Sequence, residues 1–234
     1  MVKFSEYINS LIHLIYPELC MACNKRTTDI NNTFCLDCYT ELPFTHHTDL
    51  RENDFSDHFK GKFRISFATS LFYFVKTGVV QNIIKQLKYH SKDTYGIKIG
   101  QLFGITFQDS EFVKSVDIIV PVPLHKKKEA KRGYNQSLKF GEGISSYLNI
   151  PVSKGNLIRV KNTLSQTQMN NEARIRNVKD AFQVTNPEEF INKHILLVDD
   201  VLTTGSTLLE CAVTLKDIPG ITISMATIAM GENV

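Results

Sequence analysis

Residues 195–207, ILLVDDVLTTGST, constrain the fold more than any other stretch of this chain. Four apolar residues precede two adjacent aspartates, a pattern typical of a strand that is buried on both faces. The residues after Ser206 place apolar side chains at the spacing of an amphipathic helix. The stretch therefore predicts a buried strand, a short loop and a helix in direct succession.

The loop in this stretch has the composition of a phosphate-binding site. Free backbone N–H groups and the positive end of the helix dipole attract anions at a helix start, and Gly205 lets the backbone approach closely. Adjacent carboxylates at Asp199 and Asp200 repel each other, so ribose hydroxyls or a hydrated Mg²⁺ would suit them. Four residues add hydroxyl donors: Thr203, Thr204, Ser206 and Thr207. An ordinary turn and helix cap would need only one or two such residues, so we favour a cradle for a sugar phosphate.

Four of the five cysteines fall in one segment near the start of the chain. They form two C-x2-C pairs with eleven residues between them: Cys20, Cys23, Cys35 and Cys38. This spacing is typical of a four-thiolate zinc site, and without a secretion signal we expect zinc rather than disulfides. Residues 16–44 contain little apolar material, so metal binding would supply much of their stability.

A change in composition predicts two parts. Residues 45–62 are polar without periodicity, which indicates a linker on which His46 and His47 would be solvated. We expect an N-terminal helix, the zinc module and the linker in residues 1–60, and the main domain in residues 61–234. Periodicity predicts strands at 67–75, 116–122, 157–160, 181–185, 194–198 and 221–229, and helices at 80–89, 95–107, 134–148 and 206–217. Their alternation predicts an α/β fold, a mainly parallel sheet flanked by helices.

Length and composition are those of a soluble protein. The chain has 234 residues, of which 42% are hydrophobic and 22% charged. We expect no membrane insertion and a cytoplasmic location, and Cys211 should be a small core residue. A net charge of +3 is too small to indicate nucleic-acid binding by itself. The oligomeric state is not indicated.

Two polar segments adjoin predicted strands, where ligands of open α/β sheets bind. Five cations follow the strand that ends near Val122: Lys126, Lys127, Lys128, Lys131 and Arg132. They would neutralise a pyrophosphate, or else form a solvated basic turn. Residues 161–177 lack apolar periodicity, which predicts a mobile lid, unless residues 172–178 begin an edge helix whose arginines make only surface pairs.

These motifs in combination resemble the ComF family. The 195–207 stretch is similar to the signature with which type I phosphoribosyltransferases bind 5-phosphoribosyl 1-pyrophosphate (PRPP). PVPLH, KRGYNQ and TLSQT at residues 121–125, 131–136 and 163–167, with Arg174, Asn177 and Ala181-Phe182, resemble ComF motifs. The likeness extends from about residue 14 to about residue 230. ComF proteins are associated with DNA uptake in natural transformation and carry a four-cysteine element before a phosphoribosyltransferase-like domain.

The resemblance also implies roles for individual residues. It implies that Leu124, His125 and Lys126 contact the pyrophosphate of PRPP, whereas Lys127 and Lys128 face water. A flexible loop would close over PRPP with the residues Lys161, Gln166, Arg174 and Arg176. Asp200 would be the catalytic base by analogy, with Asp199 and Arg174 as the other candidate catalytic residues, and Mg²⁺ would accompany PRPP.

Two functions remain open. One is a PRPP-binding protein of DNA uptake, which would contact the uptake machinery and single-stranded DNA. The other is an active transferase, similar to an amidophosphoribosyltransferase, that moves the phosphoribosyl group to an unidentified base or amine and has no DNA role. Two basic sets would hold single-stranded DNA, although the helical lysines would equally suit a solvated face. They are Lys85, Lys88, Lys92 and Lys98 with Tyr89 and Tyr95 interleaved, and the basic turn at residues 126–132 next to Tyr134.

Overall fold

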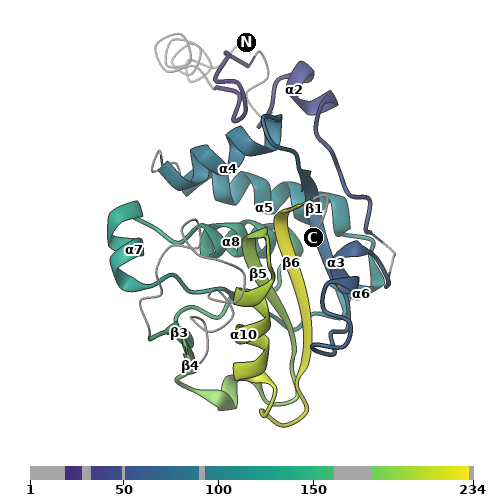
Figure 1. Ribbon diagram of the computed structural model, residues 1–234, viewed down its shortest axis with the longest axis vertical. Helices are drawn as coiled ribbons and strands as arrows, with labels where there is room; N and C mark the ends of the chain where they lie inside the picture. Colours follow the sequence, from purple (N-terminus) through teal and green to yellow (C-terminus); the bar gives the residue numbers. More distant parts are fainter. Residues whose placement is uncertain (1–18, 28–32, 49–50, 90–92, 161–180, 232–234) are drawn as a thin grey trace, which may run out of the picture.

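The computed structural model describes residues 19–27, 33–48, 51–89, 93–160 and 181–231. Its centre is a parallel sheet of four strands in the order β1-β6-β5-β2 (Figure 1). These strands are β1 (Ala68–Phe74), β2 (Ile118–Pro121), β5 (His194–Leu202) and β6 (Thr222–Gly231). The predicted mainly parallel α/β fold is confirmed.

Strand β5 shows why this sheet is buried on both faces. Leu196 and Val198 pack into one hydrophobic cluster, while Ile195 and Leu197 point to the opposite face and pack into a second. All four side chains are fully buried. A continuous apolar run is therefore required here, because neither face of the strand meets water.

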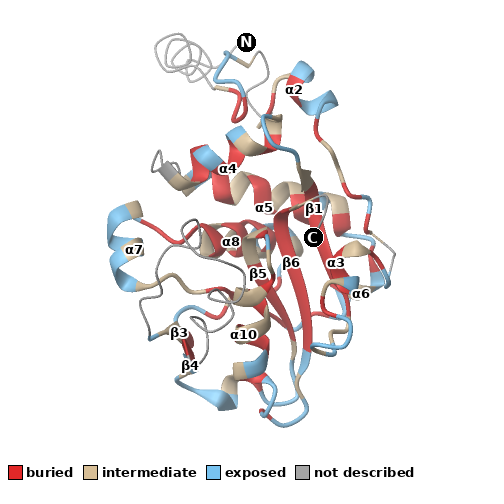
Figure 2. Ribbon diagram, viewed as in Figure 1, coloured by how far each residue is buried: buried red, intermediate tan, exposed pale blue. Residues whose placement is uncertain are grey.

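Helices cover both faces of the sheet (Figures 1 and 2). One face packs against α4 (Val79–Tyr89), α5 (Asp93–Phe107) and α8 (Gln136–Leu148). The other packs against α10 (Ser206–Leu215), α3 (Asp54–Asp57) and a hairpin of β3 (Leu157–Arg159) and β4 (Phe182–Val184). The remaining short elements are α2 (Leu36–Thr40), α6 (Glu111–Lys114), α7 (Lys126–Arg132) and the 3₁₀ helix η2 (Pro187–Phe190).

Strands β3 and β4 were predicted, but not their pairing. They form a separate two-stranded antiparallel sheet, in which Leu157 lies opposite Val184. A strand of three residues carries too little periodicity to indicate whether its partner lies in the main sheet.

The described residues of the predicted linker, 45–48 and 51–62, are packed more tightly than a polar linker would be. Asn53 caps α3 in a capping box with Ser56, and Phe55 and Phe59 are buried against the main sheet. His47 is only 5% exposed, and its Nε2 lies 2.8 Å from Asp54 Oδ1. The expectation that His47 is solvated is therefore wrong, because two phenylalanines draw this polar stretch onto the core.

The segment that leaves the cysteine module covers the outer edge of β1. Tyr73 donates its N–H to Pro43 O at 2.8 Å, and Thr45 donates to Leu71 O at 3.2 Å. The rings of Phe44 and Phe72 pack with their centroids 5.0 Å apart. The edge strand is thus paired rather than left open to another chain. Within the described ranges, no helix has both the length and the apolar character required for a bilayer crossing.

Candidate functional site

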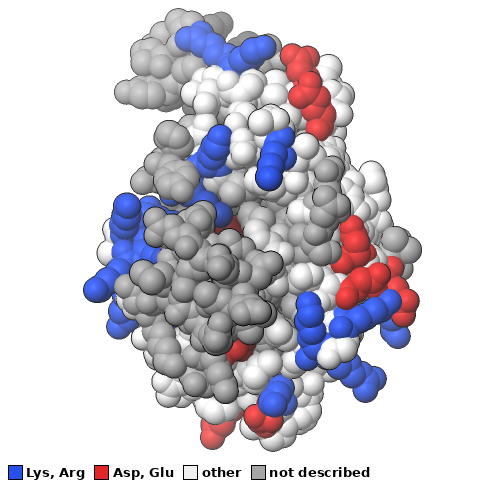
Figure 3. All heavy atoms as spheres, in the orientation of Figure 1, with Lys and Arg blue, Asp and Glu red and all other residues white. Residues whose placement is uncertain are grey.

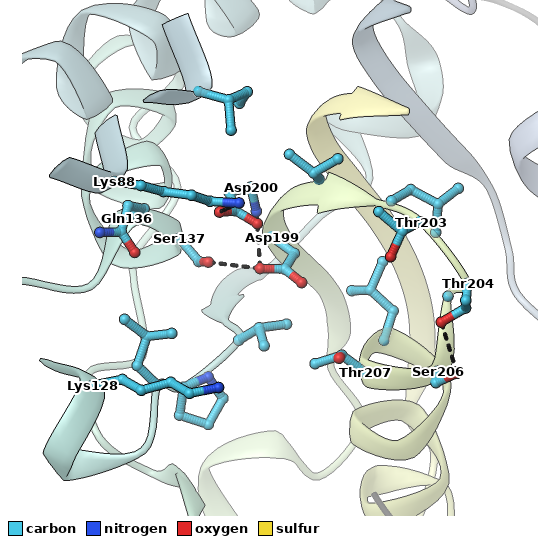
Figure 4. Close-up of a pocket in the computed structure, with 18 of the residues that line it drawn as sticks. Lys88, Lys128, Gln136, Ser137, Asp199, Asp200, Thr203, Thr204, Ser206 and Thr207 are labelled. Carbon is cyan, nitrogen blue, oxygen red and sulfur yellow. Dashed lines mark hydrogen bonds and ion pairs between the residues drawn. The ribbon is translucent and has the colours of Figure 1, made fainter. Parts of the chain in front are cut away.

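A cavity of about 460 Å³ lies where β5 ends and α10 begins (Figure 4). Its walls come from α4, α7 and α8 as well as from the strand ends. Every residue of the 199–207 stretch lines it, so the predicted acid pair and hydroxyl loop share one space. Because this position lies beyond the carboxyl ends of parallel strands, it is where ligands of open α/β sheets bind.

The two aspartates are held by groups from three elements. Asp199 Oδ1 accepts hydrogen bonds from Ser137 Oγ at 2.9 Å and from the Asp200 N–H at 2.9 Å. Lys88 Nζ lies 3.0 Å from Asp200 Oδ2 (Figure 4). Burial, and next the charge of Asp200, raise the pKa of Asp199 to about 7, although Ser137 and Lys88 act in the opposite direction. Near pH 7 this carboxyl is present in both its protonated and its ionised form, so it can bind ribose hydroxyls either as donor or as acceptor.

The loop after β5 is shaped for close approach by a ligand. Gly205 has a φ of +66° and precedes α10 as its N-cap. His58 Nε2 lies 2.7 Å from Thr204 O, which ties the loop to the segment after α3. The hydroxyls of Thr204 and Ser206 are 2.9 Å apart. The N–H groups at the start of α10 and these hydroxyls together offer several donors to one anion.

Cations line a further wall of the cavity. Lys128 and Arg132 come from α7, and Arg159 comes from the end of β3. Burial, and next the neighbouring charges of Arg159 and Arg132, lower the pKa of Lys128. Clustered cations of this kind stabilise a ligand with several negative charges, such as a pyrophosphate.

The structure distinguishes among the residues predicted for the pyrophosphate loop. Leu124 lines the cavity. His125 instead caps α7, since its Nδ1 accepts the Lys127 N–H at 3.2 Å. Lys126 is exposed and outside the lining, whereas Lys128, which we expected to face water, lies inside it. The predicted loop residues Lys161, Gln166, Arg174 and Arg176 lie outside the described residues.

The lining residues that did not enter the predicted site include three that contribute polar or charged groups: Lys88, Ser137 and Arg159. Lys88 was assigned to a helical surface, Ser137 had no assigned role, and Arg159 belonged to a predicted strand. Arg159 could have been predicted, because it is a charged residue at the end of a strand that leads into a polar segment. For Lys88 the indication was its place beside the apolar face of α4, which carries Ile84 and Leu87.

The four N-terminal cysteines form a second candidate site. Their Sγ atoms all lie within 4.8 Å of one another, and those of Cys23 and Cys35 are 3.7 Å apart. Tetrahedral zinc with bonds of about 2.3 Å places its sulfurs about 3.8 Å apart. Burial raises the pKa of Cys20, but backbone hydrogen bonds from Cys23 and Cys35 outweigh it and lower that pKa to about 7. This cluster therefore could hold a zinc ion, while Cys211 is buried in the core as expected.

Of the lysines and tyrosines expected to contact DNA, Lys85 is exposed, but Tyr95, Tyr134 and Lys88 are not placed for that role. Tyr95 and Tyr134 are buried, and Tyr134 donates its hydroxyl to Leu87 O. Lys88 faces the cavity rather than solvent. Lys92 and the side chain of Tyr89 lie outside the described residues. Basic side chains do gather over α7 on the face shown in Figure 3.

Comparisons with known proteins agree with this architecture. Residues 134–231 match the family described as phosphoribosyl transferase domain. The chain is 32% identical to Competence protein F of Haemophilus influenzae over 138 residues, which cover 57% of this chain and 60% of the relative. It is 30% identical to DNA utilization protein YhgH of Salmonella typhimurium over 133 residues, which cover 56% of this chain and 58% of the relative. The chain thus matches about three-fifths of the length of these relatives.

Among solved structures, a glutamine PRPP amidotransferase from B. subtilis complexed with ADP and GMP superimposes with a TM-score of 0.40. It is 16% identical, and the match covers 60% of this chain and 30% of that one. The sequence matches, the parallel sheet and the four-cysteine cluster lead to one assignment. These findings support the ComF family, and residues 134–231 of this chain match a phosphoribosyl transferase domain.

Proposed function

We propose that this protein binds PRPP in the 460 Å³ cavity and acts in DNA uptake. The observation that carries the binding proposal is the meeting of three kinds of group in one space. The loop at the start of α10 suits the 5-phosphate, and Asp199 and Asp200 suit the ribose hydroxyls. The cations Lys128, Arg132 and Arg159 suit the pyrophosphate, which would bring Mg²⁺ with it.

The names of the relatives support the biological role. Competence and DNA utilization are the functions that those names state. Our proposal places this chain in the cytoplasm, where reducing conditions keep the four thiols available to zinc. It also divides the chain into residues 1–60, with the zinc module, and residues 61–234, with the PRPP-binding domain.

Calorimetric titration tests the PRPP site. We expect PRPP with Mg²⁺ to bind the wild-type protein and raise its melting temperature. The double variant Asp199→Asn/Asp200→Asn keeps side-chain volume but removes the two charges, and it should lose this response. Asp217→Asn is the matched control, because Asp217 is exposed beyond the other end of α10. Absence of binding by the wild-type protein at millimolar PRPP would refute the proposal.

Single-stranded DNA is the proposed macromolecular partner, with the uptake machinery beyond it. Exposed lysines on α7 offer phosphate contacts: Lys126, Lys127 and Lys131. Their replacement by alanine should weaken oligonucleotide binding and reduce its dependence on salt, because fewer counterions are released. Binding that is unaffected by these changes and by salt would exclude this surface.

Transfer of the phosphoribosyl group is the second candidate. One observation favours it: Phe74, Ile84 and Val201 give the same cavity an apolar side next to the acid pair. An apolar wall at this point would suit the ring of an acceptor. In that reaction a nitrogen nucleophile forms a bond to C1 of PRPP as the bond to pyrophosphate breaks, and the cationic wall would stabilise the leaving group. Release of pyrophosphate that requires an added base or amine would establish transfer.

A further inference from the structure

We propose that Lys88 is a positioning residue that serves as the built-in counter-ion of the acid pair, so that the ribose hydroxyls are bound without a divalent cation at Asp200. This inference rests on the proposed PRPP site. It assigns a role in that site to a lysine that was predicted from the sequence to lie on the surface of a helix. It concerns the ribose end of the ligand only. Mg²⁺ on the pyrophosphate is compatible with it.

The acid pair carries a charge that has to be compensated. Two adjacent carboxylates in a partly closed cavity need a cation, since their mutual repulsion otherwise favours protonation of one of them. Lys88 Nζ lies 3.0 Å from Asp200 Oδ2, and the two side chains are only 25% and 17% exposed. Lys88 therefore compensates part of the negative charge of the acid pair. Because this ion pair is withdrawn from water, it is screened less than a surface pair.

Lys88 is held in place through the residue that precedes it. The residue before it, Leu87, accepts hydrogen bonds at its carbonyl oxygen from Tyr134 OH at 2.5 Å and from Gln136 Nε2 at 3.3 Å. Gln136 begins α8, and the next residue is Ser137, which donates to Asp199. The end of α4 is therefore fastened to the same turn that orients Asp199, and Lys88 is placed with the acid pair rather than swinging freely.

Each aspartate keeps one carboxylate oxygen for a ligand. The described contacts of the two carboxylates use Asp199 Oδ1 and Asp200 Oδ2. We therefore assign ligand hydroxyls to Asp199 Oδ2 and Asp200 Oδ1. Mg²⁺ needs oxygen ligands at about 2.1 Å in octahedral geometry, and it would have to displace the ammonium group from Asp200 to bind there.

Ribose 5-phosphate is the probe that isolates this end of the site, because it has the ribose hydroxyls and the 5-phosphate but no pyrophosphate. We expect the wild-type protein to bind it with nearly the same affinity in EDTA and in Mg²⁺. Lys88→Met keeps most of the side-chain length without the charge, and it should bind roughly tenfold or more weakly in EDTA. Added Mg²⁺ should restore part of the loss, and Lys88→Arg should retain binding in EDTA.

Lys85→Met is the matched control on the same helix. Lys85 is exposed and its Nζ contacts Gln81 Oε1 at 3.1 Å, so its loss should leave ribose 5-phosphate binding unchanged. Thermal unfolding of each variant separates a binding defect from a folding defect.

The outcomes separate this inference from the proposed function. If PRPP with Mg²⁺ fails to bind the wild-type protein, the proposed function falls and takes the role of Lys88 with it. If PRPP binds, three results overturn the role of Lys88 alone. These are ribose 5-phosphate binding that needs Mg²⁺ in the wild type, equal binding in EDTA by Lys88→Met, and tighter binding by Lys88→Met, which would show that the lysine blocks the site.

Discussion

Gly205 combines two demands that no other residue type meets at the start of α10. Its φ of +66° lies in the left-handed region, and a Cβ there would sit 2.7 Å from the ring of His58. We predict that Gly205→Ala lowers the free energy of unfolding by about 2 kcal/mol, the sum of left-handed strain and this overlap. It should also weaken phosphate binding, because His58 must shift and it contacts Thr204 O. Urea unfolding and ligand titration measure the two effects.

Gly155 provides the comparison for this variant. It also has a positive φ, +82°, but a Cβ there would meet nothing within 4 Å. Gly155→Ala should therefore cost only the strain of about 1 kcal/mol and leave ligand binding unchanged. If the free energy of unfolding falls equally in the two variants, the overlap with His58 does not contribute to the loss at Gly205.

We predict that Asp199 makes the stability of the fold decrease with rising pH in the acidic range. Its pKa is raised from 3.8 to about 7 in the folded protein, chiefly by burial. Between these values the folded state holds a proton that the unfolded state has released, so this residue makes stability fall as pH rises from about 4 to about 7. Asp199→Asn should remove that fall, which urea unfolding at several pH values will show.

The difference between wild type and variant isolates Asp199 from other titrating groups. Burial lowers the pKa of His47 and of His194, and each therefore makes stability rise with pH up to its unfolded value near 6.5. These contributions are common to both proteins and cancel. Parallel curves for the wild type and Asp199→Asn would show that Asp199 titrates normally in the fold.

Among the elements, α5 and α8 approach each other closely through glycines. A Cβ on Gly143 would overlap Ile97 O and come within 2.8 Å of Gly100 Cα. Helix α8 also carries Ser137, so a displaced α8 would move the hydrogen bond to Asp199. We predict that Gly143→Ala costs about 1–3 kcal/mol of stability and weakens PRPP binding, as measured by unfolding and calorimetry.

Gly104 tests whether close packing or helix propensity decides the result. It lies on α5, and a Cβ there would sit 2.8 Å from Tyr147 Cβ, an atom that rotation of the tyrosine side chain does not move. Alanine is a better helix former by about 1 kcal/mol, but the overlap requires a shift of the two helices, so Gly104→Ala should still lower the free energy of unfolding. The loss should be smaller than for Gly143→Ala, whose added methyl group would overlap backbone atoms. Unchanged stability of Gly104→Ala would mean that the gain in helix propensity outweighs the overlap at this interface.

Sequence periodicity located most of these elements because each long strand or helix carries its own apolar pattern. Helix α3 was missed, since Phe55 and Phe59 are too few to outweigh the polar residues around them. Within the site, residues 199–207 were predictable because one strand and one loop bring them together. Lys88 and Arg159 reach the cavity only through tertiary packing, which short-range patterns do not contain.

At the scale of the whole molecule, the cysteine module and the main domain share one core. Cys20, Met21 and Phe34 belong to the same buried cluster as Leu71 of β1 and Ile83 of α4. The backbone of residues 43–45 also pairs with the edge of β1. Loss of zinc from the module should therefore destabilise the sheet, and through the sheet it should also affect the cavity at the strand ends.

Zinc content and thermal unfolding test this coupling. We predict one zinc per chain in the purified protein, and a fall in melting temperature when a strong chelator removes it, because bound metal supplies folding free energy to the module. Cys38→Ser should lose zinc and unfold at a lower temperature. Cys211→Ala is the control, since Cys211 is buried in the other cluster and should keep full zinc content. Because the two parts share a core, chelation should also reduce protection of β1 amides from hydrogen exchange. Unchanged protection there would mean that the module folds and unfolds without the sheet.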